Sequence, residues 1–113
     1  MLTVPLRLVS EANLREHWAT RARRRRQHRS VVALSLRAHA RPELPAVITL
    51  TRLAPRRLDT DNLAAACKAA RDGVADWLGV DDGDARIEWR CEQRSAGAGV
   101  YGLEVAWCAA RDC

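Results

Sequence analysis

The chain has 113 residues, a length that suits one domain with one hydrophobic core. Apolar residues make up 48% of it, which excludes a disordered composition, and no apolar run approaches the roughly 20 residues of a membrane-spanning helix. The formal net charge is +5, and all of the 19 basic residues except Lys68 are arginines. An arginine excess with many alanines is typical of a GC-rich gene. The start of the chain lacks the pattern of a signal peptide, so we expect a soluble, cytoplasmic protein.

The first part of the chain predicts a strand and then a long helix. Residues 2–9 alternate between apolar and polar side chains, as a β-strand does, and Pro5 places this strand at a sheet edge or starts it later. Residues 11–40 contain no proline or glycine, which predicts a long helix that is frayed or bent in its arginine run and ended by Pro42 and Pro45. Ser10 is the expected N-cap, with Asn13 as the alternative.

The rest of the chain predicts three strands and a second helix. Residues 46–53 are rich in β-branched side chains and predict a buried strand. Residues 61–78 predict a helix. Residues 86–93 and 100–107 alternate again and predict a β-hairpin around a glycine-rich turn.

This order of strand, helix, strand, helix, strand, strand predicts a single α+β domain over residues 1–113, with both helices on one face of a small mixed sheet. The tail, residues 108–113, is expected to be loose. The four cysteines have no spacing typical of a zinc site. We expect reduced thiols, two of them in the core, and a disulfide is the less favoured alternative.

The predicted helix at 61–78 has an apolar stripe and a polar stripe on opposite sides. At about 100° per residue, six apolar side chains fall on one side. They are Leu63, Cys67, Ala70, Val74, Trp77 and Leu78. The opposite side carries Asp61, Ala65, Lys68 and Asp72. Lys68 and Asp72 can form a solvated i,i+4 ion pair, but the only lysine is also a candidate for a reacting centre, because an ammonium group is not equivalent to a guanidinium.

Acidic residues mark both ends of this helix. Asp59 can be the N-cap and Asp61 a first-turn acid that suits the helix dipole, although capping needs only one carboxylate. Two hard oxygen ligands here can instead share a Mg²⁺ ion that keeps positions open for phosphate and water. Asp81, Asp82 and Asp84 form a second acidic cluster after the helix, where neighbouring glycines also indicate turns.

Residues 15–29 are strongly basic, with seven arginines and two histidines. A solvated helix face is one interpretation. Arg23–Arg26 would cover every side of a helix, however, so their repulsion favours a partner such as a phosphate backbone. Trp18 is expected to be a core anchor rather than a base-stacking platform. The basic stretch and the acidic clusters together favour a protein that binds nucleic acid and carries out metal chemistry on its phosphates.

The stretch RRLDTDNLAAACKAARDGVADWLGVDD, residues 56–82, resembles the signature of the RusA family of Holliday junction resolvases. In that family a basic residue and Asp-x-Asp-Asn lead into a helix with a lysine and an aspartate, and two adjacent aspartates follow. The matching residues are Arg57, Asp59, Asp61, Asn62, Lys68, Asp72, Asp81 and Asp82. Length, element order and the early Asn13 extend the resemblance over most of the chain. One position departs, because the family's lysine is expected at Ala65, one turn before Lys68.

The resemblance implies a homodimeric crossover junction endodeoxyribonuclease that uses Mg²⁺ or Mn²⁺. Family members make paired nicks across four-way DNA junctions in recombination and repair, and many are encoded by phages or prophages of bacteria. It implies Asp59, Asp61 and Asp82 as metal ligands and catalytic acids, with Asp81 in the same site and Lys68 as the catalytic lysine. Asp84 leaves the choice of the third acid open. A non-catalytic protein that binds branched DNA is the alternative, favoured by the displaced lysine.

DNA is expected to be held mainly through its backbone, with little sequence information. The residues expected to hold it are Asn13, Arg15, Arg21, Arg23, Arg24, Arg25, Arg26, Arg29, Arg56 and Arg57.

The length of the second helix bears on how its acidic ends can meet. From Asp61 to Leu78 the helix rises by roughly 25 Å, whereas the ligands of one metal lie within a few ångströms of it. Asp82 is therefore not expected to join Asp59 and Asp61 of its own chain. A two-fold dimer with antiparallel helices would place the acids of two subunits together, so we hypothesise a shared site.

Overall fold

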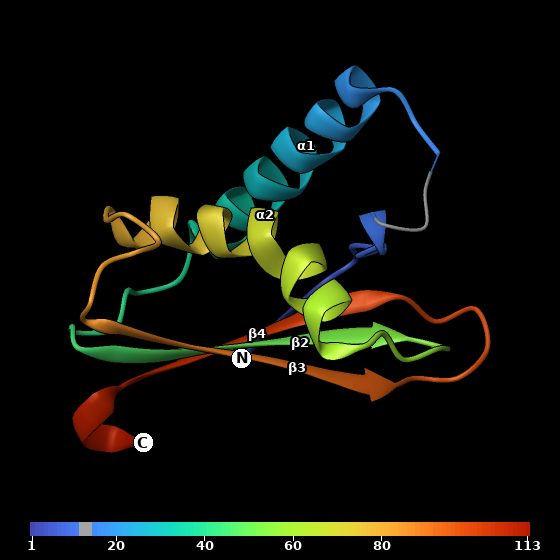
Figure 1. Ribbon diagram of the computed structural model, residues 1–113. Helices are drawn as coiled ribbons and strands as arrows, with labels where there is room; N and C mark the ends of the chain where they lie inside the picture. The colour runs from blue at the N-terminus through green and yellow to red at the C-terminus, as the bar shows by residue number, and fades with distance from the viewer. Residues whose placement is uncertain (12–14) are drawn as a thin grey trace.

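Two helices lie on one face of a four-stranded mixed sheet in the computed structural model, which describes residues 1–11 and 15–113 (Figure 1). The predicted α+β class and the placing of both helices on one face are confirmed. The helices are α1 (Trp18–Leu36) and α2 (Thr60–Leu78). The strands are β1 (Leu2–Val4), β2 (Ala46–Ala54), β3 (Ile87–Ser95) and β4 (Gly102–Ala109), and a short 3₁₀ helix, η2 (Ala110–Asp112), follows.

The strands lie in the order β1-β4-β2-β3. β2 pairs with β4 in antiparallel and with β3 in parallel orientation, so Ile48 has Trp107 on one side and Trp89 on the other. The predicted hairpin of the last two strands is therefore wrong. The apolar β2 lies between β3 and β4, and the connection between these two strands crosses from one side of β2 to the other. Gly97 and Gly99 lie in this connection with positive φ angles of 94° and 72°.

The N-terminal elements begin and end differently from the prediction. β1 is an edge strand, as Pro5 suggested, and it ends at Val4 directly before the proline. α1 begins at Trp18 and is capped by His17, whose Nδ1 accepts a hydrogen bond from the Ala19 amide at 3.1 Å, so the predicted cap at Ser10 is wrong. Asn13, the alternative cap, lies outside the described residues.

Trp18 is 74% exposed, so the expected core anchor is wrong as well. The reason is the course of α1. Its buried residues, Val32 and Leu36, are both in its second half, and its N-terminal end projects away from the sheet (Figure 1).

The core lies between the sheet and α2. All six residues of the predicted apolar stripe of α2 are buried, and they meet the central strand residues Ile48 and Leu50 in one cluster. α1 crosses α2 closely at Gly73, where a Cβ atom would lie 2.5 Å from the carbonyl oxygen of Arg29. The glycine therefore sets how near the two helices come, because a side chain there would overlap α1 backbone.

The cysteines form two pairs. Cys108 and Cys113 are joined by a disulfide, so the expectation of reduced thiols is wrong for this pair. Residues 108–113, the segment expected to be loose, contain the end of β4 and η2. Cys67 and Cys91 are free thiols with their sulfur atoms 2.7 Å apart, Cys67 buried and Cys91 half-buried. The contact with Cys91 and burial raise the pKa of the Cys67 thiol. No helix in the described part of the chain is long and apolar enough to cross a membrane.

Candidate functional site

Asp59 and Asp61 lie at the exposed start of α2. Asp59 is the N-cap, and its Oδ1 accepts a hydrogen bond from the Asn62 amide at 2.8 Å while Oδ2 accepts one from the Asn62 side chain at 2.9 Å. Asp61 is an acid of the first turn, where the helix dipole favours a negative charge. The capping interpretation of Asp59 is thus confirmed, and the Asp61 carboxylate faces solvent.

Lys68 joins the middle of α2 to the acidic segment that follows the helix. Its Nζ lies 2.6 Å from Asp82 Oδ2 and 2.9 Å from Asp72 Oδ1, so the expected i,i+4 pair with Asp72 is present together with a second partner. The chain turns back at Gly79, the left-handed C-cap of α2, and the indole of Trp89 donates a hydrogen bond to the Asp82 carbonyl at 2.9 Å. These two features bring Asp82 to the side of α2.

The remaining acids of the second cluster have local partners. Asp81 accepts a hydrogen bond from the Gly83 amide at 2.7 Å, as turn aspartates do. Asp84 accepts hydrogen bonds from the side chain and the amide of Arg86, which lower the pKa of Asp84 to about 2. Of the two candidates for the third acid, only Asp82 contacts Lys68 in the described structure.

The contact between Lys68 and Asp82 predicts a pH dependence. The hydrogen bond from Lys68 holds the pKa of Asp82 below its ordinary value of 3.8. A lowered folded-state pKa adds stability that is fully present above the ordinary value and is lost as the pH falls through the lowered one. The unfolding free energies of the wild type and Asp82→Asn should therefore differ at about pH 7 and converge as the pH falls below 3.8 and through the lowered pKa of Asp82. The difference should be small because the Lys68 side chain is 54% exposed.

Urea unfolding at several pH values measures this difference, and Asp112→Asn, at an exposed acid in η2, is the matched control. A gap between wild type and Asp82→Asn that does not shrink as the pH falls below 3.8 would contradict the assignment.

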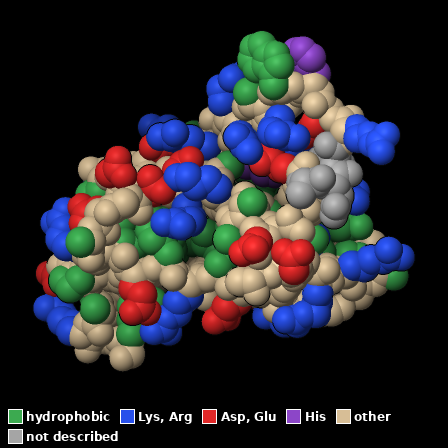
Figure 2. Space-filling view, in the orientation of Figure 1, with side chains coloured by type: hydrophobic (Ala, Val, Ile, Leu, Met, Phe, Trp, Pro, Cys, Tyr) green, Lys and Arg blue, Asp and Glu red, His purple; other side chains and the backbone are tan. Residues whose placement is uncertain are grey.

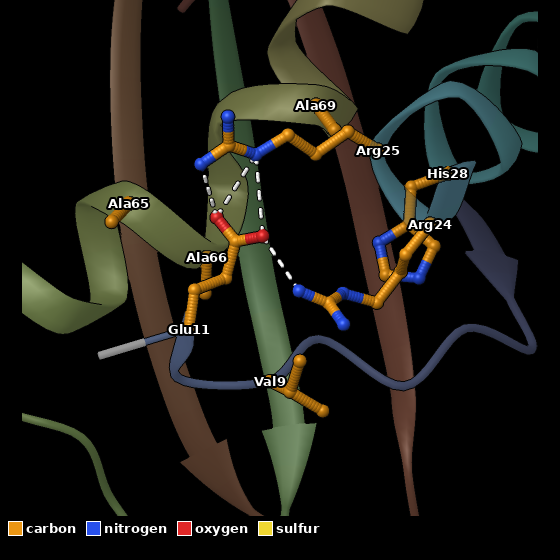
Figure 3. Close-up of a pocket in the computed structure, with 8 residues that line it drawn as sticks. All are labelled: Val9, Glu11, Arg24, Arg25, His28, Ala65, Ala66 and Ala69. Carbon is orange, nitrogen blue, oxygen red and sulfur yellow. Dashed lines mark hydrogen bonds and ion pairs between the residues drawn. The ribbon is translucent and has the colours of Figure 1, made fainter. Parts of the chain in front are cut away.

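Carboxylates of the same chain compensate part of the arginine run. Figure 3 shows Glu11 between Arg24 and Arg25, at 2.6 Å from an Nη2 atom of each. Glu16 also binds Arg24, with a carboxylate oxygen 2.6 Å from the same Nη2 atom. The expectation that a phosphate backbone compensates the whole run is therefore too broad. Arg29, further along α1, is held by Asp76 of α2 through two hydrogen bonds of 2.6 and 2.7 Å.

Other predicted DNA-binding arginines remain available. In the described part of the chain, five of the arginines predicted to bind DNA are exposed and have no carboxylate partner: Arg15, Arg23, Arg26, Arg56 and Arg57. The Nε atom of Arg21 lies 3.6 Å from Oε1 of Glu16, a longer ion-pair distance than those of Arg24. Figure 2 shows basic and acidic side chains side by side over the two helices. Asn13 lies outside the described residues, so its predicted role stays a prediction.

The two acidic groups are not brought into one metal site. Among residues 1–11 and 15–113, no three carboxylate, histidine or cysteine side chains are grouped so that they could hold one metal ion. Asp59 and Asp61 supply the hard oxygens that Mg²⁺ prefers, but among the described residues no third side chain of this kind is grouped with them. The described residues of one chain therefore do not fit a complete Mg²⁺ site.

Arg52 is not one of the site residues predicted from the sequence, although it is the one charged side chain of β2. It is 7% exposed, and it donates hydrogen bonds to the carbonyl oxygens of Leu8 at 3.0 Å and Arg56 at 2.7 Å. A charged residue inside an otherwise uncharged, buried strand is a signal that could have identified it.

Taken together, the site has three parts: the acidic start of α2, the Lys68 ion pairs with Asp72 and Asp82, and the exposed arginines around them. Their arrangement combines groups that attract phosphate with acids that can serve hydrolysis. Neither a protein-family model nor any curated protein or solved structure matches this chain.

Proposed function

We propose that the chain is a Mg²⁺-dependent, structure-specific endodeoxyribonuclease that resolves four-way DNA junctions, and that two copies form the working enzyme. The observation that carries the proposal is the 2.6 Å contact between Lys68 and Asp82. These two residues belong to separate parts of the RusA-like motif, and local geometry alone does not require them to meet. Their contact places a cation and an acid of that motif in one group on the surface of α2.

Arginines next to this group support DNA as the substrate, because they can bind its phosphate backbone. A groove lined by Arg25, Arg26, Arg29 and Asp72 runs from the basic part of α1 to Lys68 on α2. A DNA backbone laid along α1 would compensate Arg23 and Arg26, which have no partner among the described residues. Contacts of this kind position a duplex without reading its sequence, which suits an enzyme selective for branched structure.

Lys68 is suited to electrostatic stabilisation rather than to proton abstraction. The hydrogen bonds from Lys68 to Asp82 and Asp72 raise the pKa of the ammonium group, so Lys68 stays protonated at neutral pH. A fixed cation of this kind stabilises charge that develops on a scissile phosphate. Asp72 and Asp82 then act by orienting Lys68 toward the groove.

In this proposal a second copy of the chain completes the set of Mg²⁺ ligands. Asp59 and Asp61 of one copy would hold Mg²⁺ together with Asp81 and Asp82 of the other, since one chain does not group three such ligands among its described residues. Mg²⁺ bound there would neutralise phosphate charge and activate water. An antiparallel arrangement of two α2 helices is the simplest geometry that brings the two acidic ends together.

A non-catalytic protein that binds branched DNA is the second candidate. Two observations favour it. Lys68 is hydrogen-bonded to two acids, Asp72 and Asp82. Ala65 stands at the position where the resemblance expects the lysine.

One experiment separates the two candidates. A labelled four-way junction is incubated with the protein and Mg²⁺, and in parallel with EDTA. Paired, symmetric nicks that depend on Mg²⁺ would support the nuclease. A gel shift without cleavage in either condition would support the binding protein and contradict the nuclease proposal.

A further inference from the structure

The described residues that line a cleft at the end of β2 include three arginines and no carboxylate. Its volume is about 290 Å³, and Arg7, Arg52, Arg56 and Tyr101 are among the residues that line it. It lies where the segment after β1 passes the end of β2, away from the Lys68 group described above. Positive charge is therefore concentrated in the cleft.

Arg52 is the unusual member of this group, because it is a buried cation. Both of its hydrogen bonds go to neutral carbonyl oxygens, and it has no carboxylate partner among the described residues. A buried charge is costly unless an opposite charge or a full set of hydrogen bonds compensates it, and a guanidinium has five N–H donors. Burial lowers the pKa of Arg52, and the nearby Arg7 cation adds to this effect. An anion in the cleft would compensate the buried charge of Arg52 and the repulsion between Arg52 and Arg7.

The walls of the cleft hold the other cations in place. The guanidinium of Arg7 lies 4.2 Å from the centre of the Tyr101 ring, a cation–π contact that fixes Arg7 beside the opening. The carbonyl of Arg56 is tied to Arg52, so the Arg56 backbone is anchored while its side chain stays exposed. The chain then runs through Arg57 to the Asp59 cap of α2, which connects the cleft to the acidic start of that helix.

We propose that this cleft binds a phosphate group of a nucleic-acid strand through Arg7, Arg52 and Arg56. Planar guanidinium groups match the geometry of phosphate oxygens and bind them through paired hydrogen bonds. A phosphate held here would anchor a nucleic-acid strand at the end of β2, before Asp59 and Asp61 in the chain. The arginines of α1 would hold DNA at a separate place. The identity of the polymer rests on the function proposed above, but the capacity to bind phosphate does not.

Site-resolved NMR tests the inference with the full-length, ¹⁵N-labelled protein at constant ionic strength. Two probes are titrated separately: inorganic phosphate, and a short single-stranded oligonucleotide without a terminal phosphate. Both should shift the backbone amides of Leu8, Ala54 and Tyr101 in a saturable way. Arg7→Gln should weaken both affinities about tenfold, the equivalent of one charge-assisted contact. Tyr101→Leu, which removes the ring that holds Arg7, should act in the same direction. These two variants are used because Arg52 also ties two backbone segments together.

Arg90→Gln is the matched control, since Arg90 is an exposed arginine of β3 paired with Glu88 outside the cleft. It should leave both affinities unchanged. Absence of saturable shifts with both probes, or equal weakening in Arg90→Gln, would overturn the inference. Binding of inorganic phosphate without the oligonucleotide would overturn its nucleic-acid part. Saturable oligonucleotide binding by a protein that never cleaves junctions would support the cleft and contradict only the proposed nuclease.

Discussion

Asp61→Asn is expected to lower the rate of junction cleavage by roughly a hundredfold or more, because a neutral amide cannot replace a carboxylate that holds Mg²⁺. Junction binding should be unchanged or tighter, since one negative charge beside the DNA is removed. Single-turnover cleavage of a labelled junction and a binding titration at the same salt concentration measure the two effects separately.

The matched control is Asp112→Asn, which removes an exposed acid of η2 at the end of the chain. It should cleave at the wild-type rate. Asp61 is exposed in the first turn of α2, so its replacement should cost at most about 1 kcal/mol of helix-dipole stabilisation and leave the protein folded. Cleavage by Asp61→Asn at the wild-type rate would show that the acidic start of α2 is not the reacting site.

Gly73→Ala is expected to lower the free energy of unfolding by about 1–3 kcal/mol, although helix propensity alone predicts a gain of about 1 kcal/mol. The added Cβ would lie 2.5 Å from the Arg29 carbonyl oxygen and 2.9 Å from Val32 Cβ. Both atoms belong to α1, and one of them is backbone, so the two helices would have to move apart. Val32 is fully buried, and the separation would disturb its packing.

Chemical denaturation of Gly73→Ala beside Ala64→Gly tests this explanation. Ala64 is exposed on the same helix, so its replacement reports helix propensity alone and should cost about 1 kcal/mol. If Gly73→Ala instead stabilised the protein by about the amount that Ala64→Gly destabilises it, propensity would dominate and the close crossing of α1 and α2 would be contradicted.

The features that the sequence predicts well are those that depend on local periodicity. The apolar stripe of α2 follows from residues three and four apart, and all of its members are buried. The sheet order could not be predicted in the same way, because residues 86–93 and 100–107 alternate alike and a short glycine-containing connection suggests a hairpin. Which strand lies beside β2 depends on long-range packing on both of its sides.

The candidate site shows the same division between local and long-range effects. The Lys68–Asp72 pair follows from helical spacing, whereas the choice of Asp82 over Asp84 depends on the turn at Gly79 and on the hydrogen bond from Trp89. Glu11, the carboxylate that Arg24 and Arg25 share, lies more than ten residues earlier in the chain, so the periodicity of the basic run did not predict this contact.

The central claim is that acids at the two ends of α2 act together across two copies of the chain. Cleavage by mixed Asp61→Asn and Asp82→Asn subunits tests it most directly, with subunit exchange verified by differently tagged copies. Each variant alone should be inactive, and the mixture should regain cleavage because a mixed dimer contains one complete site. A mixture that stays as inactive as its two components after verified exchange would contradict the claim.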